Sequence, residues 1–133
     1  MIGRALALAA AAAFLVPAAT AAEQTGFAFG RTGGNIRPFA VVLATTGVVR
    51  ATGPVQVRTT PVPRLRLGRL NQLAVTVGFG RLKSQTNCPG TLPDVATTYI
   101  RVGRQTVRVH GNCVAGYQRL WQALASATNL AYP

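Results

Sequence analysis

The sequence predicts an α+β fold: an antiparallel sheet of about four strands, in two hairpins, packed on one or two helices in the order ββ(β)α–ββα. Three observations lead to this prediction. Side chains alternate between the two faces of an extended chain, with the period of a strand, in Thr25–Thr32 and in Val95–His110. Tyr117–Leu124 places apolar residues at i, i+3, i+4 and i+7, as an amphipathic helix does. Strands and helices fall in separate runs, so the helices are expected to cover one face of the sheet.

The first part of the domain is expected to be strands separated by turns. The segments with strand patterning are Thr25–Thr32, Phe39–Thr45 and Val48–Thr52, and Val55–Arg58 alternates in a way that would extend the hairpin. In the first strand Phe27 and Phe29 fall on one face, with Ala28 and Gly30 on the other. Gly, Asn and Pro residues at the breaks supply the permissive backbone of turns.

A helix is expected in the middle of the chain. Leucine, alanine and valine recur from Leu67 to Val77 at i, i+3, i+6, i+7 and i+10, and the helix would end before Gly78. Residues 70–78 would also suit a strand, because Gly68 weakens a helix and Ala74–Val77 is β-prone. Gly80–Asp94 is expected to be a loop. The second hairpin would comprise Val95–Val102 and Gln105–His110, joined at Gly103-Arg104.

Residues 1–21 have the pattern of a secretory signal peptide. One positive charge precedes the apolar run Ala5–Val16, and small residues follow Pro17. We place the cleavage after Ala21 or Ala22, leaving one small domain, 22–133, and a secreted protein. The alternative is an uncleaved anchor, although the run is shorter than the ~20 residues of a spanning helix. No membrane span is expected after cleavage.

The charge is strongly one-sided. Fourteen Lys and Arg residues against two acidic residues give a formal net charge of +12, and Asp94 is the one acidic residue of the expected folded body. Such a field favours acidic partners: an acidic protein surface, an anionic envelope polymer or lipid headgroups. Export argues against nucleic acid as a partner. A GC-rich genome would also explain the preference for Arg over Lys, but not the shortage of acids.

The two cysteines, Cys88 and Cys113, are expected to form a disulfide, because an even count in an exported chain favours pairing. The alternatives are a free thiol pair or a metal site. Two cysteines and His110, the single histidine, fall short of a structural zinc set.

The composition argues against an enzyme, and we expect no cofactor and no metal. A pair of catalytic carboxylates is excluded, because the expected folded body has one acidic residue. Ser84, Ser126, His110 and Asp94 could supply the residue types of a serine triad, but neither serine lies in a G-x-S-x-G motif. Gly33-Gly34 leads into a strand rather than a helix, so it reads as a hairpin turn and not as a phosphate-binding loop.

The chain resembles the emfourin family of small inhibitors of thermolysin-like metalloproteases. The resemblance begins at Phe29–Gly34, which is similar to the aromatic-x-Arg-Ser/Thr-Gly-Gly end of that family's first strand. It continues through the hairpin around Gly47, the Leu-rich segment Leu65–Leu82, the hairpin Tyr99–Val109 and the terminal helix. The basic charge, the cysteine pair and the less regular middle helix depart from the family pattern.

The resemblance implies a monomeric, cystatin-like wedge that blocks a protease cleft with exposed loops. The candidate partner contact is the first turn, which comprises Arg31, Thr32, Gly33, Gly34, Asn35 and Arg37. In the alternative interpretation these glycines only turn the chain and both arginines are solvated. Trp121 is expected in the core rather than at an interface. The alternative function is an envelope-associated basic protein that binds anionic polymers and has no protease target.

Overall fold

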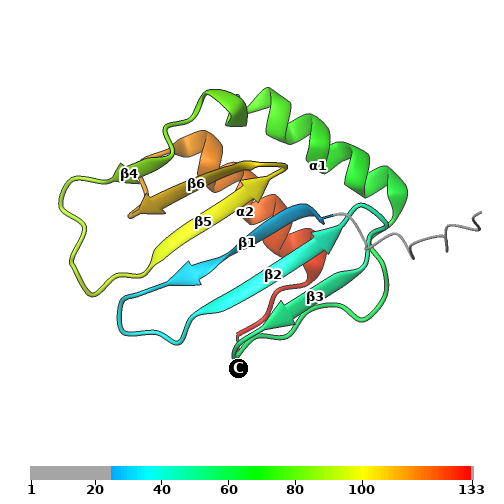
Figure 1. Ribbon diagram of the computed structural model, residues 1–133, viewed down its shortest axis with the longest axis horizontal. Coiled ribbons are helices and arrows are strands. Elements are labelled where there is room, and N and C mark those ends of the chain that lie inside the picture. Colours follow the sequence, from blue (N-terminus) through cyan, green and yellow to red (C-terminus); the bar gives the residue numbers. More distant parts are fainter. Residues whose placement is uncertain (1–24, 133) are drawn as a thin grey trace, which may run out of the picture.

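In the part of the chain that the structure describes, six strands form one mixed sheet in the order β3-β2-β1-β5-β6-β4 (Figure 1). The computed structural model describes residues 25–132. The strands are β1 (Thr25–Thr32), β2 (Phe39–Ala44), β3 (Val49–Thr52), β4 (Gln85–Asn87), β5 (Thr97–Val102) and β6 (Gln105–His110). The helices are α1 (Arg64–Thr76) and α2 (Ala115–Thr128), with a short 3₁₀ turn, η1 (Phe79–Arg81), after α1. Neighbouring strands are antiparallel except β4, which runs parallel to β6.

The α+β class is confirmed, but the sheet is wider than the four antiparallel strands expected. β3 completes the first hairpin, and β1 joins the two hairpins by pairing with β5. β4 is the unexpected strand: its three residues, Gln85–Asn87, are polar and show no strand pattern. It forms within the segment expected to be a loop because β6 offers it an edge to pair with.

Both helices pack on one face of the sheet, and the alternation of the strands sends large side chains toward them. Phe29, Val41 and Ile100 are fully buried on this face, and so is Leu120 of α2. Trp121 is buried as expected, with its ring centroid 5.2 Å from that of Phe29. The apolar period of Tyr117–Leu124 therefore correctly predicted the buried stripe of α2.

Tyr117 carries a hydroxyl into this core. That hydroxyl lies 2.8 Å from the hydroxyl of Thr98, so the buried polar atom has a hydrogen-bond partner. Burial nevertheless raises the pKa of Tyr117 well above its usual value, because an ionised phenolate would lose its hydration there.

The middle helix is confirmed, and with it the helical rather than the strand interpretation of most of residues 70–78. α1 ends at Thr76, and Gly78 follows in the left-handed conformation (φ 67°). Leu70 and Ala74 are its buried residues. By contrast, 55–58 does not extend the first hairpin: Gln56 instead pairs with Ala131 beyond α2.

The expected signal peptide, residues 1–21, lies outside the described residues. Within 25–132, no helix is long and apolar enough to cross a membrane.

Candidate functional site

Two loops meet at one end of the sheet, on the left of Figure 1. One is the turn 33–38 between β1 and β2. The other is the loop 88–96 between β4 and β5. We call these two loops together the loop end.

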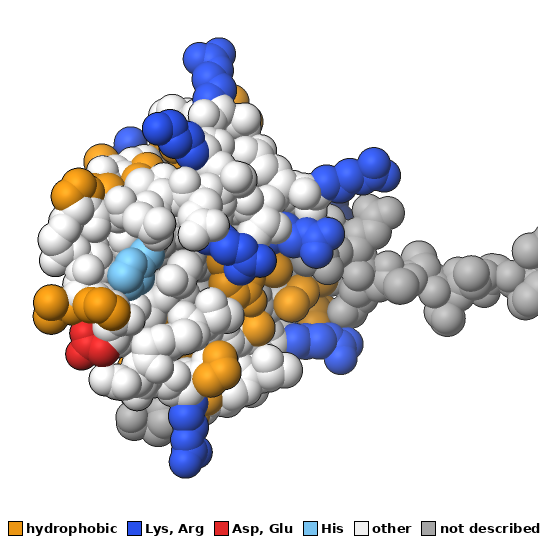
Figure 2. All heavy atoms as spheres, turned by 60° about the vertical axis from the view of Figure 1, so that its left-hand side comes forward, with side chains coloured by type: hydrophobic (Ala, Val, Ile, Leu, Met, Phe, Trp, Pro, Cys, Tyr) orange, Lys and Arg blue, Asp and Glu red, His pale blue; other side chains and the backbone are white. Residues whose placement is uncertain are grey.

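The loop end exposes apolar side chains on both loops. Ile36 in the turn is 42% exposed, and Leu92 and Val95 in the longer loop are 64% and 43% exposed. Figure 2 shows hydrophobic side chains projecting here beside the carboxylate of Asp94, the one acidic residue in 25–132. Clustered apolar side chains at loop tips are a feature of interaction surfaces.

The two loops are braced directly against each other. The N–H of Asn35 donates to the carbonyl oxygen of Asp94 at 3.1 Å. Gly34 has a φ of 65°, and a Cβ there would collide with the backbone of Asp94 and Ala96. Glycine is therefore required at this position both by its conformation and by the close approach of the second loop.

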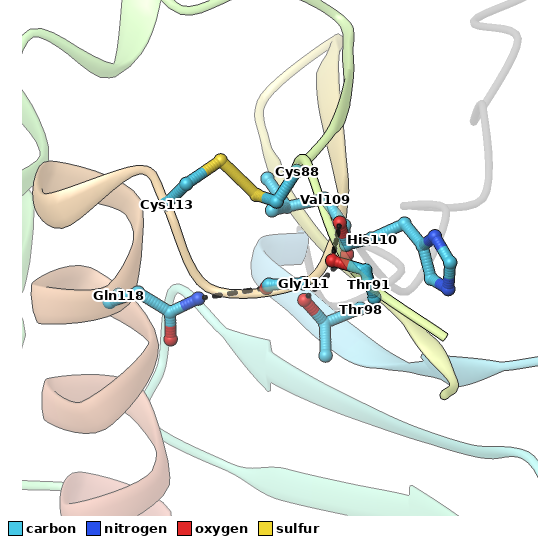
Figure 3. The surroundings of a disulfide bond; sticks show 8 residues. All are labelled: Cys88, Thr91, Thr98, Val109, His110, Gly111, Cys113 and Gln118. Carbon is cyan, nitrogen blue, oxygen red and sulfur yellow. Dashed lines mark hydrogen bonds between the residues drawn. A yellow bond between two sulfur atoms is a disulfide. The ribbon is translucent and has the colours of Figure 1, made fainter. Parts of the chain in front are cut away.

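The longer loop is also fixed to the body of the domain. Cys88 and Cys113 form the expected disulfide, with a Cα–Cα distance of 5.7 Å (Figure 3). This bond ties the end of β4 to the segment that leads into α2. A disulfide indicates an oxidising, extracytoplasmic environment for the chain.

His110, at the end of β6, holds the loop at three points. Its carbonyl oxygen accepts hydrogen bonds from the N–H of Cys88 at 2.8 Å and from the hydroxyl of Thr91 at 3.5 Å. Its side-chain Nε2–H donates to the carbonyl oxygen of Val95 at 2.9 Å. The histidine is therefore a strand-end residue, as expected, and it positions Val95.

Arg31 separates two hollows under the turn. The larger, about 570 Å³, lies between Arg31, Trp121 and the longer loop. The smaller, about 280 Å³, lies between Arg31, Arg37 and Tyr132. Ile36 lines both hollows, so the turn forms a ridge with a depression on each side.

The predicted contact residues divide into two groups. Five of them are exposed, at the end of β1 (Thr32) and on the turn (Gly33, Gly34, Asn35 and Arg37). Arg31 is half-buried instead, with its guanidinium carbon 5.0 Å from the ring centroid of Tyr132 and 5.9 Å from that of Trp121. The aromatic rings hold Arg31 beneath the turn, on the helix side of the sheet.

Sequence reasoning did not identify the second loop as part of the site. Leu92 stands in Gly80–Asp94, which was expected to be a loop, and Val95 was expected to begin a strand that starts at Thr97 instead. The available signal was the disulfide, which restricts where a loop beginning at Cys88 can go. Apolar residues within such a restrained loop are candidates for contact.

The residue types considered above for a metal site and for a serine triad can be located in the structure. Within 25–132 no group of three or more His, Cys, Asp or Glu side chains could hold a metal ion. Ser126 accepts a hydrogen bond from Arg66 at 3.1 Å, and the side chain of His110 contacts the backbone carbonyl of Val95 at 2.9 Å.

Comparison of the chain with models of protein families, with curated proteins and with solved structures found no match.

Proposed function

We propose that this is an exported binding protein that inserts its loop end into the cleft of a thermolysin-like metalloprotease and inhibits it. The observation that carries the proposal is the pair of mutually braced loops that expose Ile36, Leu92 and Val95. The resemblance of Phe29–Gly34 to the emfourin family supplies the class of target.

The bracing favours tight binding. A loop that is already ordered loses less entropy when it associates than a mobile one. Here the ordering comes from the contact between Gly34 and Asp94, the His110 contacts and the disulfide. The exposed apolar tips would then contribute contact area, while Arg37 would lie at the rim and pair with an acidic group of the protease.

The first experiment is an inhibition titration. The secreted chain, with its disulfide formed, is titrated against a thermolysin-like protease at low and at physiological salt. We expect saturable inhibition that persists at physiological salt, because burial of apolar tips is screened less than a diffuse attraction between charges. Absence of inhibition at both salt concentrations would overturn the assigned target.

A pair of variants locates the contact. Leu92→Asp places a charge at the proposed interface, and we expect it to weaken inhibition at least about tenfold, since a buried unpaired charge is costly. Leu65→Asp makes the same change on α1, where Leu65 is 72% exposed, and we expect little effect. Equal effects of the two variants would place the contact elsewhere. Thermal unfolding of both variants checks that the fold is unchanged.

A further inference from the structure

The face of the sheet that the helices leave open carries three arginines on the described strands: Arg50 of β3, which pairs with Val42, and the neighbours Arg101 of β5 and Arg108 of β6. Ile100, Val107 and Val109 are buried under the helices, so alternation places Arg101 and Arg108 on the opposite face, where both are exposed. Arg101 pairs with Thr106 across β5 and β6, and Arg108 lies two residues further along β6. The two arginines are therefore diagonal neighbours, with backbones about 7–8 Å apart.

A tyrosine positions Arg108. The ring of Tyr99 lies across Gly30 of the central strand, where a Cβ would come within 3.0 Å of the ring. The guanidinium carbon of Arg108 is 5.8 Å from the centroid of that ring, within the range of a cation–π contact. Burial raises the pKa of the Tyr99 hydroxyl, and the nearby charge of Arg108 opposes this rise.

A backbone contact positions Arg101. Its Nε–H donates to the carbonyl oxygen of Gly103 at 3.0 Å. This bond uses one of the five N–H donors of a guanidinium. The other four belong to the exposed end of the side chain, so the charge is anchored while its fork remains available to a ligand.

Between Arg101 and Arg50, the two central strands β1 and β2 carry short, uncharged side chains on this face. Ala28 lies opposite Arg101 and Val42 lies opposite Ala28, so this row crosses β1 and β2 without a long side chain. Ala40 occupies the adjacent row, opposite Gly30. Figure 2 shows hydrophobic side chains lying between Lys and Arg side chains, whereas the acidic side chain in view lies at the loop end. An extended chain can therefore lie across these strands, beside Arg101 and Arg108.

We propose that this open face binds a linear polymer of phosphate groups, with Arg101 and Arg108 contacting phosphates along one chain. The planar guanidinium fork matches phosphate oxygens, and the excess of positive charge attracts a polyanion. Neither arginine lines the two hollows of the loop end. The surface is therefore separate from the proposed protease contact and does not depend on it.

The test uses the secreted protein, with its disulfide formed, and long-chain inorganic polyphosphate as the probe. The variant is R101Q/R108Q. The matched control is R64Q/R69Q, which removes the same charge from exposed positions on α1. We expect the open-face variant to weaken binding at physiological salt at least about tenfold and the control less than about threefold. The salt slope, log K against log salt, should flatten by about 1.4 in the open-face variant, since each phosphate contact on a single chain contributes about 0.7.

The outcomes separate the alternatives. Equal weakening by the two variants would show a diffuse attraction to net charge and would overturn the site. Unchanged binding of R101Q/R108Q would also overturn it. Tighter binding of polygalacturonate or of single-stranded DNA than of polyphosphate would overturn the choice of polymer. Leu92→Asp, which lowers the net charge by one, should weaken polyphosphate binding no more than R64Q/R69Q does, which keeps this test distinct from that of the protease.

Discussion

At the scale of single residues, two adjacent glycines have different roles. Gly33 and Gly34 both have positive φ, at 71° and 65°. A Cβ on Gly33 would meet nothing within 4 Å, whereas one on Gly34 would collide with the backbone of the second loop. Gly33 therefore allows the chain to turn, and Gly34 allows the neighbouring loop to approach closely. The interpretation as a simple turn describes Gly33 alone.

This difference predicts unequal costs of substitution. Gly33→Ala should cost about 1–2 kcal/mol, the usual penalty of a side chain in the left-handed conformation. Gly34→Ala should cost about 1–3 kcal/mol more, because backbone atoms of Asp94 and Ala96 must also move. Urea unfolding of the two variants measures the free energies. Equal losses would contradict the close contact between the loops.

At the scale of elements, periodicity predicted those parts that bury one face. β1, β2, β5, β6 and α2 each repeat large apolar side chains toward the core. The four strands were predicted close to their observed bounds, and the apolar run Tyr117–Leu124 lies within α2. β4 and the bracing of 88–96 could not be predicted in this way. They depend on pairing with β6 and on contacts with Asn35 and His110, which are distant in sequence. The candidate site was for the same reason only half predicted: the turn was identified and its partner loop was not.

Removal of the disulfide should affect the loop end more than the sheet. We expect Cys88→Ser/Cys113→Ser to lose about 3.5 kcal/mol of stability on the chain-entropy model. Amide hydrogen exchange should quicken in 88–96, while the central strand β1 keeps its relative protection. We also expect this variant to inhibit the protease more weakly, since a loop that is no longer held in place must be ordered on binding. Unchanged exchange in 88–96 would contradict the role of the disulfide in holding the loop.

At the scale of the whole molecule, the protein presents two surfaces of different character. The loop end combines apolar tips with Asp94, the one acidic residue of 25–132. The open sheet face carries Arg101 and Arg108. An apolar ridge suits a cleft in a folded partner, whereas anchored cations on a flat face suit a polyanion. The two proposals together assign a phosphate polymer and a protease to separate surfaces of the same domain.

The most direct test of the central claim is amide hydrogen exchange on the protein alone and saturated with an inactivated thermolysin-like protease. We expect exchange in the complex to slow at 33–38 and 89–95 and to stay unchanged in α1. Protection of α1 or of the open sheet face, with both loops exchanging as in the free protein, would contradict the claim.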